Sequence, residues 1–145
     1  MELDKELVNR VKTLKFNYTD SPQPGLLIAI PNDNPDVDYD VEFSTSEFTS
    51  LCPLNVSQPD YATIGIVYVP DKLRVELKSL KFYLASFRMV PIFHEQVPCT
   101  ILNDLYAAIQ PKWMRVTGDF TIRGGIHTQV VATTGEGNGS NALSA

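Results

Sequence analysis

One cysteine and one aspartate are spaced so that they could add a thiol to an electrophilic carbon. Cys52 lies in the segment LCPLNVSQPD, which ends at Asp60. A thiol reacts as its thiolate, and a nearby carboxyl can protonate the atom that gains charge when the sulfur adds. We expect residues 52–60 to form a loop that folds back and brings the carboxyl to the sulfur. The alternative is a purely structural role, in which Cys52 is a small buried residue and Asp60 a residue of a turn.

His94 and Glu95 stand just before a predicted helix. A carboxylate there can accept two parallel N–H bonds, such as those of the ring N–H and exocyclic amine of a guanine-like base. The alternative is an acidic residue favoured by the dipole at a helix N-terminus. Cys52, His94 and Cys99 could also ligate a metal. Their spacing lacks a compact pattern such as CxxC or HxxxH, so we predict no metal site.

The charges of the chain are distributed unevenly. The formal net charge of −5 argues against nucleic acid as a direct partner. Residues 71–88 nevertheless hold five basic residues and only two acidic ones. Lys78, Lys81 and Arg88 follow one another at helical spacing, so they form a basic stripe on one side of a predicted helix. Such a stripe suits a small phosphorylated ligand or, more simply, a solvated helix face.

Sequence periodicity predicts the elements that must position these residues. Alternating or continuous apolar runs predict strands at residues 26–30, 39–48, 62–69, 112–122 and 126–133. Helical spacing predicts helices at residues 76–88 and 95–110. Their predicted buried faces are Leu77, Leu80, Leu84 and Phe87 in the first helix, and Ile101, Leu102, Leu105 and Ile109 in the second. Gly124-Gly125 predicts a hairpin turn, and residues 1–24 are mixed and partly extended.

The order of the main elements is strand, strand, helix, helix, strand, strand. This ββααββ order predicts an α+β domain with an antiparallel sheet and both helices on one face. Such a sheet has two open edges, and closing a ring of subunits edge to edge would pair them, so we expect a homo-oligomer. Residues 1–133 form the predicted domain. Residues 134–145 lack a core pattern and are predicted to be a disordered tail.

The composition predicts a cytoplasmic protein. No stretch approaches the roughly 20 apolar residues that span a bilayer, so we expect no membrane partner. The charged start of the chain lacks the apolar centre of a secretory signal. Two cysteines make no disulfide framework.

Several segments resemble one enzyme family. The segment ELKSLKFY, residues 76–83, resembles the signature of the QueF nitrile reductases. FTSLCP and QPDYATI look like the nucleophile loop of that family, FHE like its substrate-binding segment, and GDFTIRGGI like its late hairpin. The matches follow the family order from residue 48 to residue 126. On these motifs the chain is identified as a member of the QueF family.

The resemblance implies a fold, a reaction and an assembly. The implied fold is the tunnelling fold, or T-fold. The implied reaction is the NADPH-dependent reduction of 7-cyano-7-deazaguanine to its aminomethyl form through a cysteine thioimide, a step of queuosine biosynthesis. The implied assembly is a homo-oligomer of rings with active sites between subunits.

The resemblance also implies roles for single residues. Cys52 would be the nucleophile and Asp60 the proton donor. His94 would assist proton transfer and help hold the substrate, and Glu95 would bind the deazaguanine ring. The remaining positions form two implied groups: Val75, Glu76 and Leu77 line the base pocket, and Lys78, Ser79, Lys81 and Arg123 bind the phosphates of NADPH.

One departure from the family and three alternatives remain. The spacer between Cys52 and Asp60 is one residue longer than the family spacer. An amidinotransferase of the same fold adds ammonia to the nitrile on tRNA, and the lysines of ELKSLK disfavour it. A cyclohydrolase would need a zinc site, which the spacing does not supply. A non-enzymatic purine-binding oligomer would need Glu95 but not Cys52.

Overall fold

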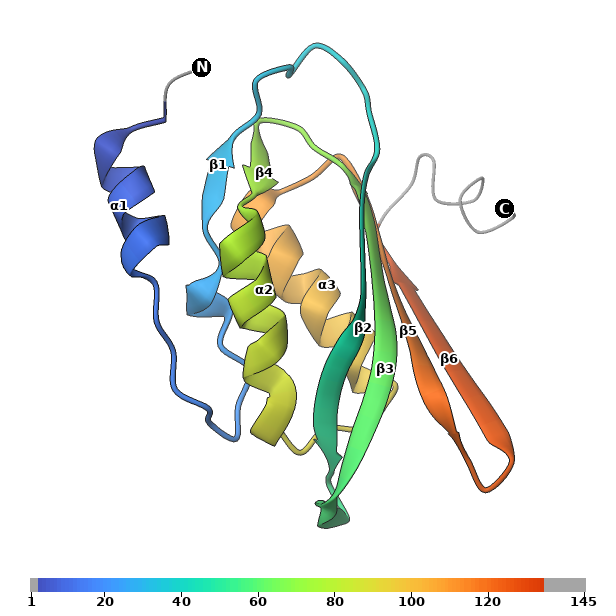
Figure 1. Ribbon diagram of the computed structural model, residues 1–145. Helices are drawn as coiled ribbons and strands as arrows, with labels where there is room; N and C mark the ends of the chain where they lie inside the picture. The colour runs from blue at the N-terminus through green and yellow to red at the C-terminus, as the bar shows by residue number, and fades with distance from the viewer. Residues whose placement is uncertain (1–2, 135–145) are drawn as a thin grey trace.

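The computed structural model describes residues 3–134 as an α+β protein (Figure 1). Its helices are α1 (Lys5–Thr13), α2 (Leu77–Ala85) and α3 (Gln96–Ile109), with 3-10 turns at Pro24–Leu26 and Ser86–Met89. Its strands are β1 (Ala29–Pro31), β2 (Val41–Cys52), β3 (Asn55–Val69), β4 (Leu73–Val75), β5 (Trp113–Arg123) and β6 (Ile126–Thr133). The predicted fold class is therefore confirmed. The predicted tail falls almost wholly on residues 135–145, which lie outside the described residues.

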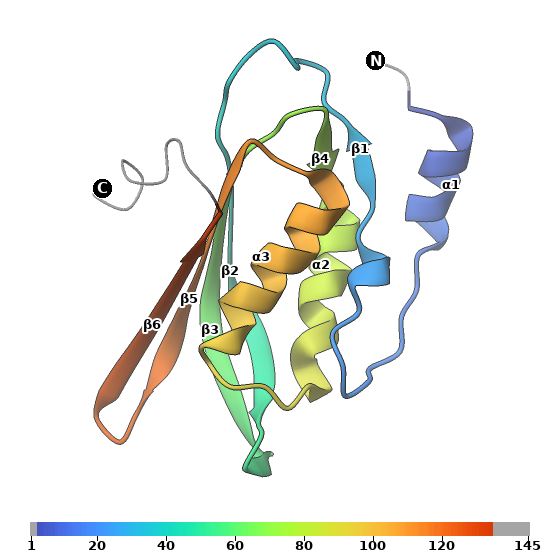
Figure 2. The same cartoon turned by 180° about the vertical axis from the view of Figure 1, so that it is seen from behind.

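The long strands form one antiparallel sheet in the order β2-β3-β5-β6, and β1 and β4 form a separate two-stranded sheet. Helices α2 and α3 cover the same face of the large sheet, as Figures 1 and 2 both show. The long elements follow the predicted order. The structure adds α1 and β4 to it, and the strand predicted at residues 26–30 is present as the shorter β1, Ala29–Pro31, after the 3-10 turn at Pro24–Leu26. The simple ββααββ order is therefore incomplete.

The helices bury the apolar faces that the sequence indicated, with one exception. Ile101, Leu102, Leu105 and Ile109 of α3 are all buried, as predicted. In α2, Leu80 and Leu84 are buried, but Leu77 is 62% exposed. Leu77 is the first residue of its helix and lines the groove between α2 and β2 together with Phe43. Its apolar side chain therefore remains available to a ligand or to another chain.

Two predicted segments have a different structure. Residues 52–60 are not a loop, because β2 extends to Cys52 and β3 begins at Asn55, so only a tight turn joins them. Residues 5–13 are not extended but form α1, whose N-terminus is capped by the Asp4 carboxylate accepting a hydrogen bond from the Glu6 N–H. Helix α1 buries none of its residues.

A hydrogen bond ties the two core helices together. The hydroxyl of Tyr83, which is 0% exposed, donates to Asp104 Oδ2 on α3 at 2.6 Å. Burial raises the pKa of the Tyr83 hydroxyl, and the adjacent Asp104 carboxylate raises it further. Desolvation also raises the pKa of Asp104, while the hydrogen bond from Tyr83 opposes that shift. The tie fixes α3, and with it the residues that precede α3.

None of the helices among residues 3–134 is long and apolar enough to cross a membrane.

Candidate active site

Asp60 is the centre of a charged cluster at one end of the large sheet. Its side chain is only 3% exposed, yet it contacts two cationic or titratable groups. His94 Nε2 lies 3.3 Å from Oδ2, and Arg123 Nη1 lies 2.7 Å from Oδ1. A buried carboxylate needs such partners, because desolvation of an unpaired charge is costly. A carboxyl group in contact with an imidazole can exchange a proton with it.

The strand register explains how Arg123 reaches Asp60. Even-numbered residues of β3, starting with Asp60, face the helices and are buried. On β5 the even-numbered residues up to Phe120 face the same way. Two residues of β5 then oppose one of β6 between Phe120 and Arg123. This bulge reverses the alternation, so that odd-numbered Arg123 joins Asp60 on the helix-covered face.

His94 is positioned by a short segment that pairs with the end of β2. The Leu51 N–H donates to Val90 O, and the Ile92 N–H donates to Leu51 O, each at 3.0 Å. Two residues later, the His94 ring stacks on Phe120, with ring centroids 4.0 Å apart and an interplanar angle of 8°. The imidazole is therefore held in one orientation, with Nε2 directed at Asp60.

Gly118 leaves the space that Phe120 occupies beneath His94. A Cβ atom at Gly118 would lie 2.8 Å from Phe120 Cε2 and 3.0 Å from Pro98 Cγ. We therefore predict that Gly118→Ala displaces the Phe120 ring, disturbs His94, and lowers the free energy of unfolding by about 1–3 kcal/mol. Urea denaturation and nitrile-dependent NADPH oxidation measure the two effects.

Gly65→Ala is the matched control for that prediction. Gly65 lies on β3 of the same sheet, but a Cβ there would meet only Thr117 Cβ, at an ordinary 3.9 Å. This variant should be as stable and as active as the parent chain. Equal stability and activity of the two variants would contradict the role given to Gly118.

Cys52 lies on the same face of the sheet as Asp60. A bulge between Thr45 and Phe48 shifts the alternation of β2, so that even-numbered Phe48 and Ser50 are buried beneath the helices. Ser50 is directly opposite Asp60. Cys52 is the next residue in this alternation, but the register shifts between Leu51 and Cys52, so that Cys52 pairs with Asn55. It is free and half-buried.

The additional residue of the Cys52 to Asp60 spacer is accommodated in β3. Leu51 pairs with Pro59, but the next residue, Cys52, pairs with Asn55. Three residues of β3, numbers 56–58, therefore have no partner on β2. A bulge of this kind bends one strand while leaving the other in register. The longer spacer changes the turn and leaves Ser50 paired with Asp60.

Glu95 lies beside this cluster and is not engaged. It directly precedes α3, is exposed, and makes no capping hydrogen bond. Within residues 3–134 its carboxylate has no ion-pair partner. Glu95 is the N-cap residue of α3, so the interpretation that the helix dipole favours an acidic residue here stays open. Both of its carboxylate oxygens remain available as acceptors.

The ELKSLK segment lies elsewhere, at the N-terminus of α2. Glu76 caps this helix by accepting hydrogen bonds from the Lys78 and Ser79 N–H groups at 2.8 and 2.7 Å. The Ser79 hydroxyl is 0% exposed and bonds to Glu76 O and the Ile28 N–H. Val75 is also buried. The side chain of Ser79 therefore supports the fold in this chain, whereas Val75, Glu76 and Leu77 line a cavity of about 780 Å³.

The two lysines of the segment point to different neighbours. Lys78 Nζ donates to Val11 O and Lys12 O at the C-terminal end of α1, at 2.9 and 3.3 Å. Lys81 is exposed and contacts only the ring of Phe82, with Nζ 5.4 Å from its centroid. Of the predicted phosphate-binding lysines, Lys81 is thus the one with a free ammonium group.

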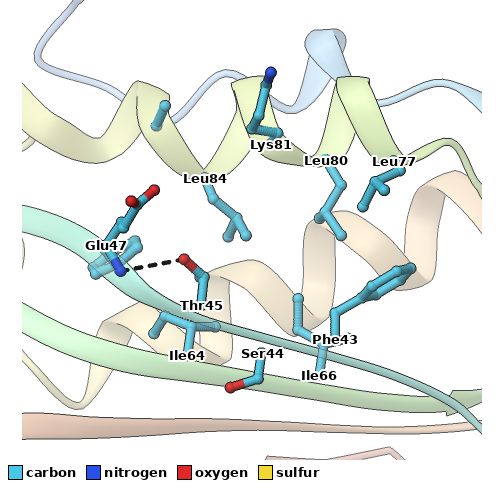
Figure 3. Close-up of a pocket in the computed structure, with 12 residues that line it drawn as sticks. Phe43, Ser44, Thr45, Glu47, Ile64, Ile66, Leu77, Leu80, Lys81 and Leu84 are labelled. Carbon is cyan, nitrogen blue, oxygen red and sulfur yellow. Dashed lines mark hydrogen bonds between the residues drawn. The ribbon is translucent and has the colours of Figure 1, made fainter.

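A groove of about 340 Å³ runs between α2 and β2. Its floor is apolar, with Phe43, Ile64 and Ile66 from the sheet and Leu80 and Leu84 from the helix. Leu77 lies at one end, and Lys81 directs its ammonium group outward from the rim (Figure 3). The groove combines an apolar surface with a nearby cation, which suits a flat ring attached to a phosphate.

Sequence reasoning found most of this site but missed three contacts. It assigned Arg123 to phosphate, and the structure pairs Arg123 with Asp60. It did not identify Phe120 or Ser50. The segment GDFTIRGGI contains both Phe120 and Arg123. The bulge that brings them to one face of the sheet cannot be recognised from the sequence pattern of a single strand. Among residues 3–134 no group of three or more His, Cys, Asp and Glu side chains is arranged to hold a metal ion.

The chain is an α+β protein with a buried carboxyl group, an imidazole and a guanidinium in contact at one end of its large sheet. The family described as QueF-like protein matches residues 59–138. The NADPH-dependent 7-cyano-7-deazaguanine reductase of Thermomicrobium roseum is 54% identical over 103 residues, 71% of this chain and 80% of the relative. The enzyme of the same name from Anaeromyxobacter sp. strain Fw109-5 is 51% identical over 110 residues, 76% of this chain and 89% of the relative.

The solved structures give a similar answer. The crystal structure of the archaeosine synthase QueF-Like in the apo form matches with a TM-score of 0.62 and 26% identity, covering 67% of this chain and 94% of that one. This chain belongs to the QueF family. The resemblance drawn from its motifs is thereby confirmed.

Proposed function

We propose that this chain reduces the nitrile of 7-cyano-7-deazaguanine to the aminomethyl group, using NADPH and a thioimide on Cys52, in cytoplasmic queuosine biosynthesis. The family and its similar relatives, which are NADPH-dependent 7-cyano-7-deazaguanine reductases, support the overall reaction. The mechanism is supported chiefly by the buried Asp60, which His94 and Arg123 contact, and by the alternation of β2, which assigns Cys52 to the same sheet face.

The first step forms one bond and moves one proton. The Cys52 sulfur adds to the nitrile carbon, and the Asp60 proton passes to the nitrile nitrogen, so one π bond of the nitrile is replaced by a C–S and an N–H bond. The thioimide is a better hydride acceptor than the nitrile. His94 contacts Asp60 at 3.3 Å and can return a proton to it between the two reductions.

Glu95 has the position and freedom to bind the base. It is the residue after His94, is exposed, and has two unoccupied carboxylate oxygens. These match the paired N–H groups of a guanine-like ring. Binding there would direct the exocyclic nitrile toward the Asp60 cluster.

NADPH supplies the hydride for each of two reductions. The residues that fit its charged and apolar parts are Lys81 at the rim of the groove, the exposed Leu77, and Arg123, which is 41% exposed and has nitrogens besides the one that contacts Asp60. Lys78 can contribute a remaining N–H, since two are directed to α1.

Removing both lysines is predicted to weaken cofactor binding. We expect Lys78→Ala with Lys81→Ala to raise the apparent KM for NADPH about tenfold or more, because each charge-assisted hydrogen bond to phosphate is lost. The KM for the nitrile should change little. Steady-state kinetics with each substrate varied in turn measures the difference.

Lys72→Ala controls for the general loss of positive charge. Lys72 is an exposed residue of the same basic segment, outside the groove. Its KM for NADPH should match that of the parent chain. Equal increases in both KM values in the double lysine variant would contradict the phosphate assignment.

The two groups of site residues lie far apart in one chain. The Val75 N–H donates to the Tyr68 hydroxyl, which places the start of α2 near the far end of β3. Asp60 and Tyr68 are eight residues apart on that strand, which at about 3.3 Å per residue is about 26 Å. A pocket that uses Val75, at the start of α2, together with the Asp60 cluster is therefore proposed to form between two subunits. This supports the proposed ring assembly of T-fold subunits with active sites between neighbours.

Subunit complementation tests this shared site. Cys52→Ala and the double lysine variant are refolded together as mixed oligomers. If each site combines one subunit's cysteine with another's lysines, the mixture regains activity that neither parent variant has at low NADPH concentration. Mixed oligomers that show only the sum of the two parent activities would contradict sharing.

The structural match favours a second candidate. The matching crystal structure is that of an archaeosine synthase, so addition of ammonia rather than hydride is the competing reaction. It would start from the same covalent intermediate. Incubation of the chain with the free nitrile plus NADPH, or with tRNA that carries the nitrile plus ammonia, separates the two by the mass of the product.

Mass spectrometry of the intact chain tests the proposed intermediate. The chain is mixed with 7-cyano-7-deazaguanine in the absence of NADPH. We expect a mass gain equal to the whole nitrile, which peptide mapping assigns to Cys52, and which disappears when NADPH is added. A chain that reduces the nitrile but never carries this mass would contradict the thioimide.

A further inference from the structure

Ser50 is a buried polar residue that the proposed mechanism does not use. Its side chain is 0% exposed, and within residues 3–134 its hydroxyl has no hydrogen-bond partner. A buried hydroxyl without a partner lowers stability relative to an apolar side chain of the same shape. The fold alone therefore gives no reason for a hydroxyl here, since an alanine would fill the position at lower cost.

The neighbours of Ser50 are the reacting groups of the site. Ser50 is directly opposite Asp60 in the register of β2 and β3. Opposed residues on one face of an antiparallel pair have Cβ atoms about 4.5–5.5 Å apart. A rotation about χ1 of Ser50 can thus bring its oxygen within hydrogen-bond distance of the carboxyl group.

The Asp60 carboxylate has an acceptor atom to offer. Arg123 Nη1 is 2.7 Å from Oδ1, but the contact lacks hydrogen-bond alignment, so that Oδ1 is itself buried without a hydrogen-bond partner. Oδ2 is the oxygen near His94. A buried donor and a buried acceptor, each without a hydrogen-bond partner, therefore lie on opposed residues of the same sheet face, although the acceptor is in an ion pair with Arg123.

We infer that Ser50 is a positioning residue whose hydroxyl donates a hydrogen bond to the Asp60 carboxylate once that residue has protonated the substrate. This inference rests on the proposed function. When Asp60 gives its proton to the nitrile nitrogen, a buried negative charge appears on its oxygens. The Ser50 O–H then supplies a donor at the atom that gains charge, and the proton of Ser50 stays on its oxygen throughout. Stabilisation of the carboxylate favours thioimide formation.

Three variants of Ser50 separate a positioning role from a structural one. Ser50→Ala removes the hydroxyl. Ser50→Thr and Ser50→Val add nearly the same bulk to the site, but only threonine retains the hydroxyl. Each variant is mixed with 7-cyano-7-deazaguanine without NADPH, and the rate of adduct formation on Cys52 is measured by mass spectrometry. Thermal melting of each variant is recorded in parallel.

We expect Ser50→Ala to form the adduct about tenfold or more slowly than the parent chain, with a melting temperature that is equal or higher. Ser50→Thr should form it clearly faster than Ser50→Val. The inference is overturned if Ser50→Ala reacts at the parent rate, or if the threonine and valine variants are equally slow. Failure of the parent chain itself to form an adduct would overturn the proposed function together with this inference, whereas normal adduct formation by every variant would overturn the inference alone.

Discussion

Cys52→Ala is expected to lower nitrile-dependent NADPH oxidation by about a thousandfold or more. Without the thiolate the nitrile stays a poor hydride acceptor, and no covalent intermediate can form. The half-buried position of Cys52 at the end of β2 means that its loss should leave the core intact. Stopped-flow and steady-state kinetic assays at saturating NADPH measure the loss of activity. Reversible binding of the nitrile should survive in this variant.

Cys99→Ala is the matched control, because it removes the other cysteine. Cys99 is a free thiol exposed on α3. This variant should keep parental activity and the parental adduct. If Cys52→Ala still consumed NADPH when the nitrile was added, the thioimide mechanism would be wrong. If Cys52→Ala bound the purine, and the parent chain also bound it without reducing it, the protein would be a non-enzymatic binding module.

Asp60→Asn should produce the second large effect. Asparagine has the shape of aspartate but no transferable proton, so thioimide formation should slow by about 10²–10⁴-fold. His94 and Arg123 lose their carboxyl partner in this variant. Arg123 is 41% exposed and can be solvated, so the fold should persist. The rate of adduct formation without NADPH isolates this step from hydride transfer.

A second acid–imidazole pair in the same sheet provides the control. His127 Nε2 contacts Asp119 Oδ1, and both side chains are about half exposed. Asp119 is odd-numbered on β5 and precedes the bulge, so it lies on the face opposite the helices. Asp119→Asn should leave adduct formation unchanged. Equal slowing in both variants would show that loss of charge, rather than loss of a proton donor, causes the effect.

The sequence predicted the long elements well because their patterns are local. Helix α3 and the β5–β6 hairpin have clear periodicity and a glycine turn, and both lie within one or two residues of the predicted bounds. Helix α1 was missed because its nine residues contribute nothing to the core. Its order depends on contacts far along the chain, such as the hydrogen bonds from Lys78.

The site was only partly predictable, for a different reason. Bulges in β2 and β5 decide which side chains share a face with Asp60, and a bulge appears only when two strands are compared in register. Cys52, Asp60 and His94 could be named from motif order. The contact of Arg123 with Asp60 and the pairing of Ser50 with Asp60 could not. The assignment of residues 1–133 to one domain stays a prediction.

The segment that holds His94 also limits how the sheet can be extended. It occupies the outward N–H and C=O groups of Leu51. Its middle residue, Pro91, forms the isolated bridge with Leu51 and has no backbone N–H, so it cannot serve as a template for a further strand. A neighbouring chain that pairs along β2 must therefore stop short of Leu51. The blocked end of β2 therefore limits a neighbouring chain to one pairing register. It favours a closed ring of subunits over open-ended addition of strands.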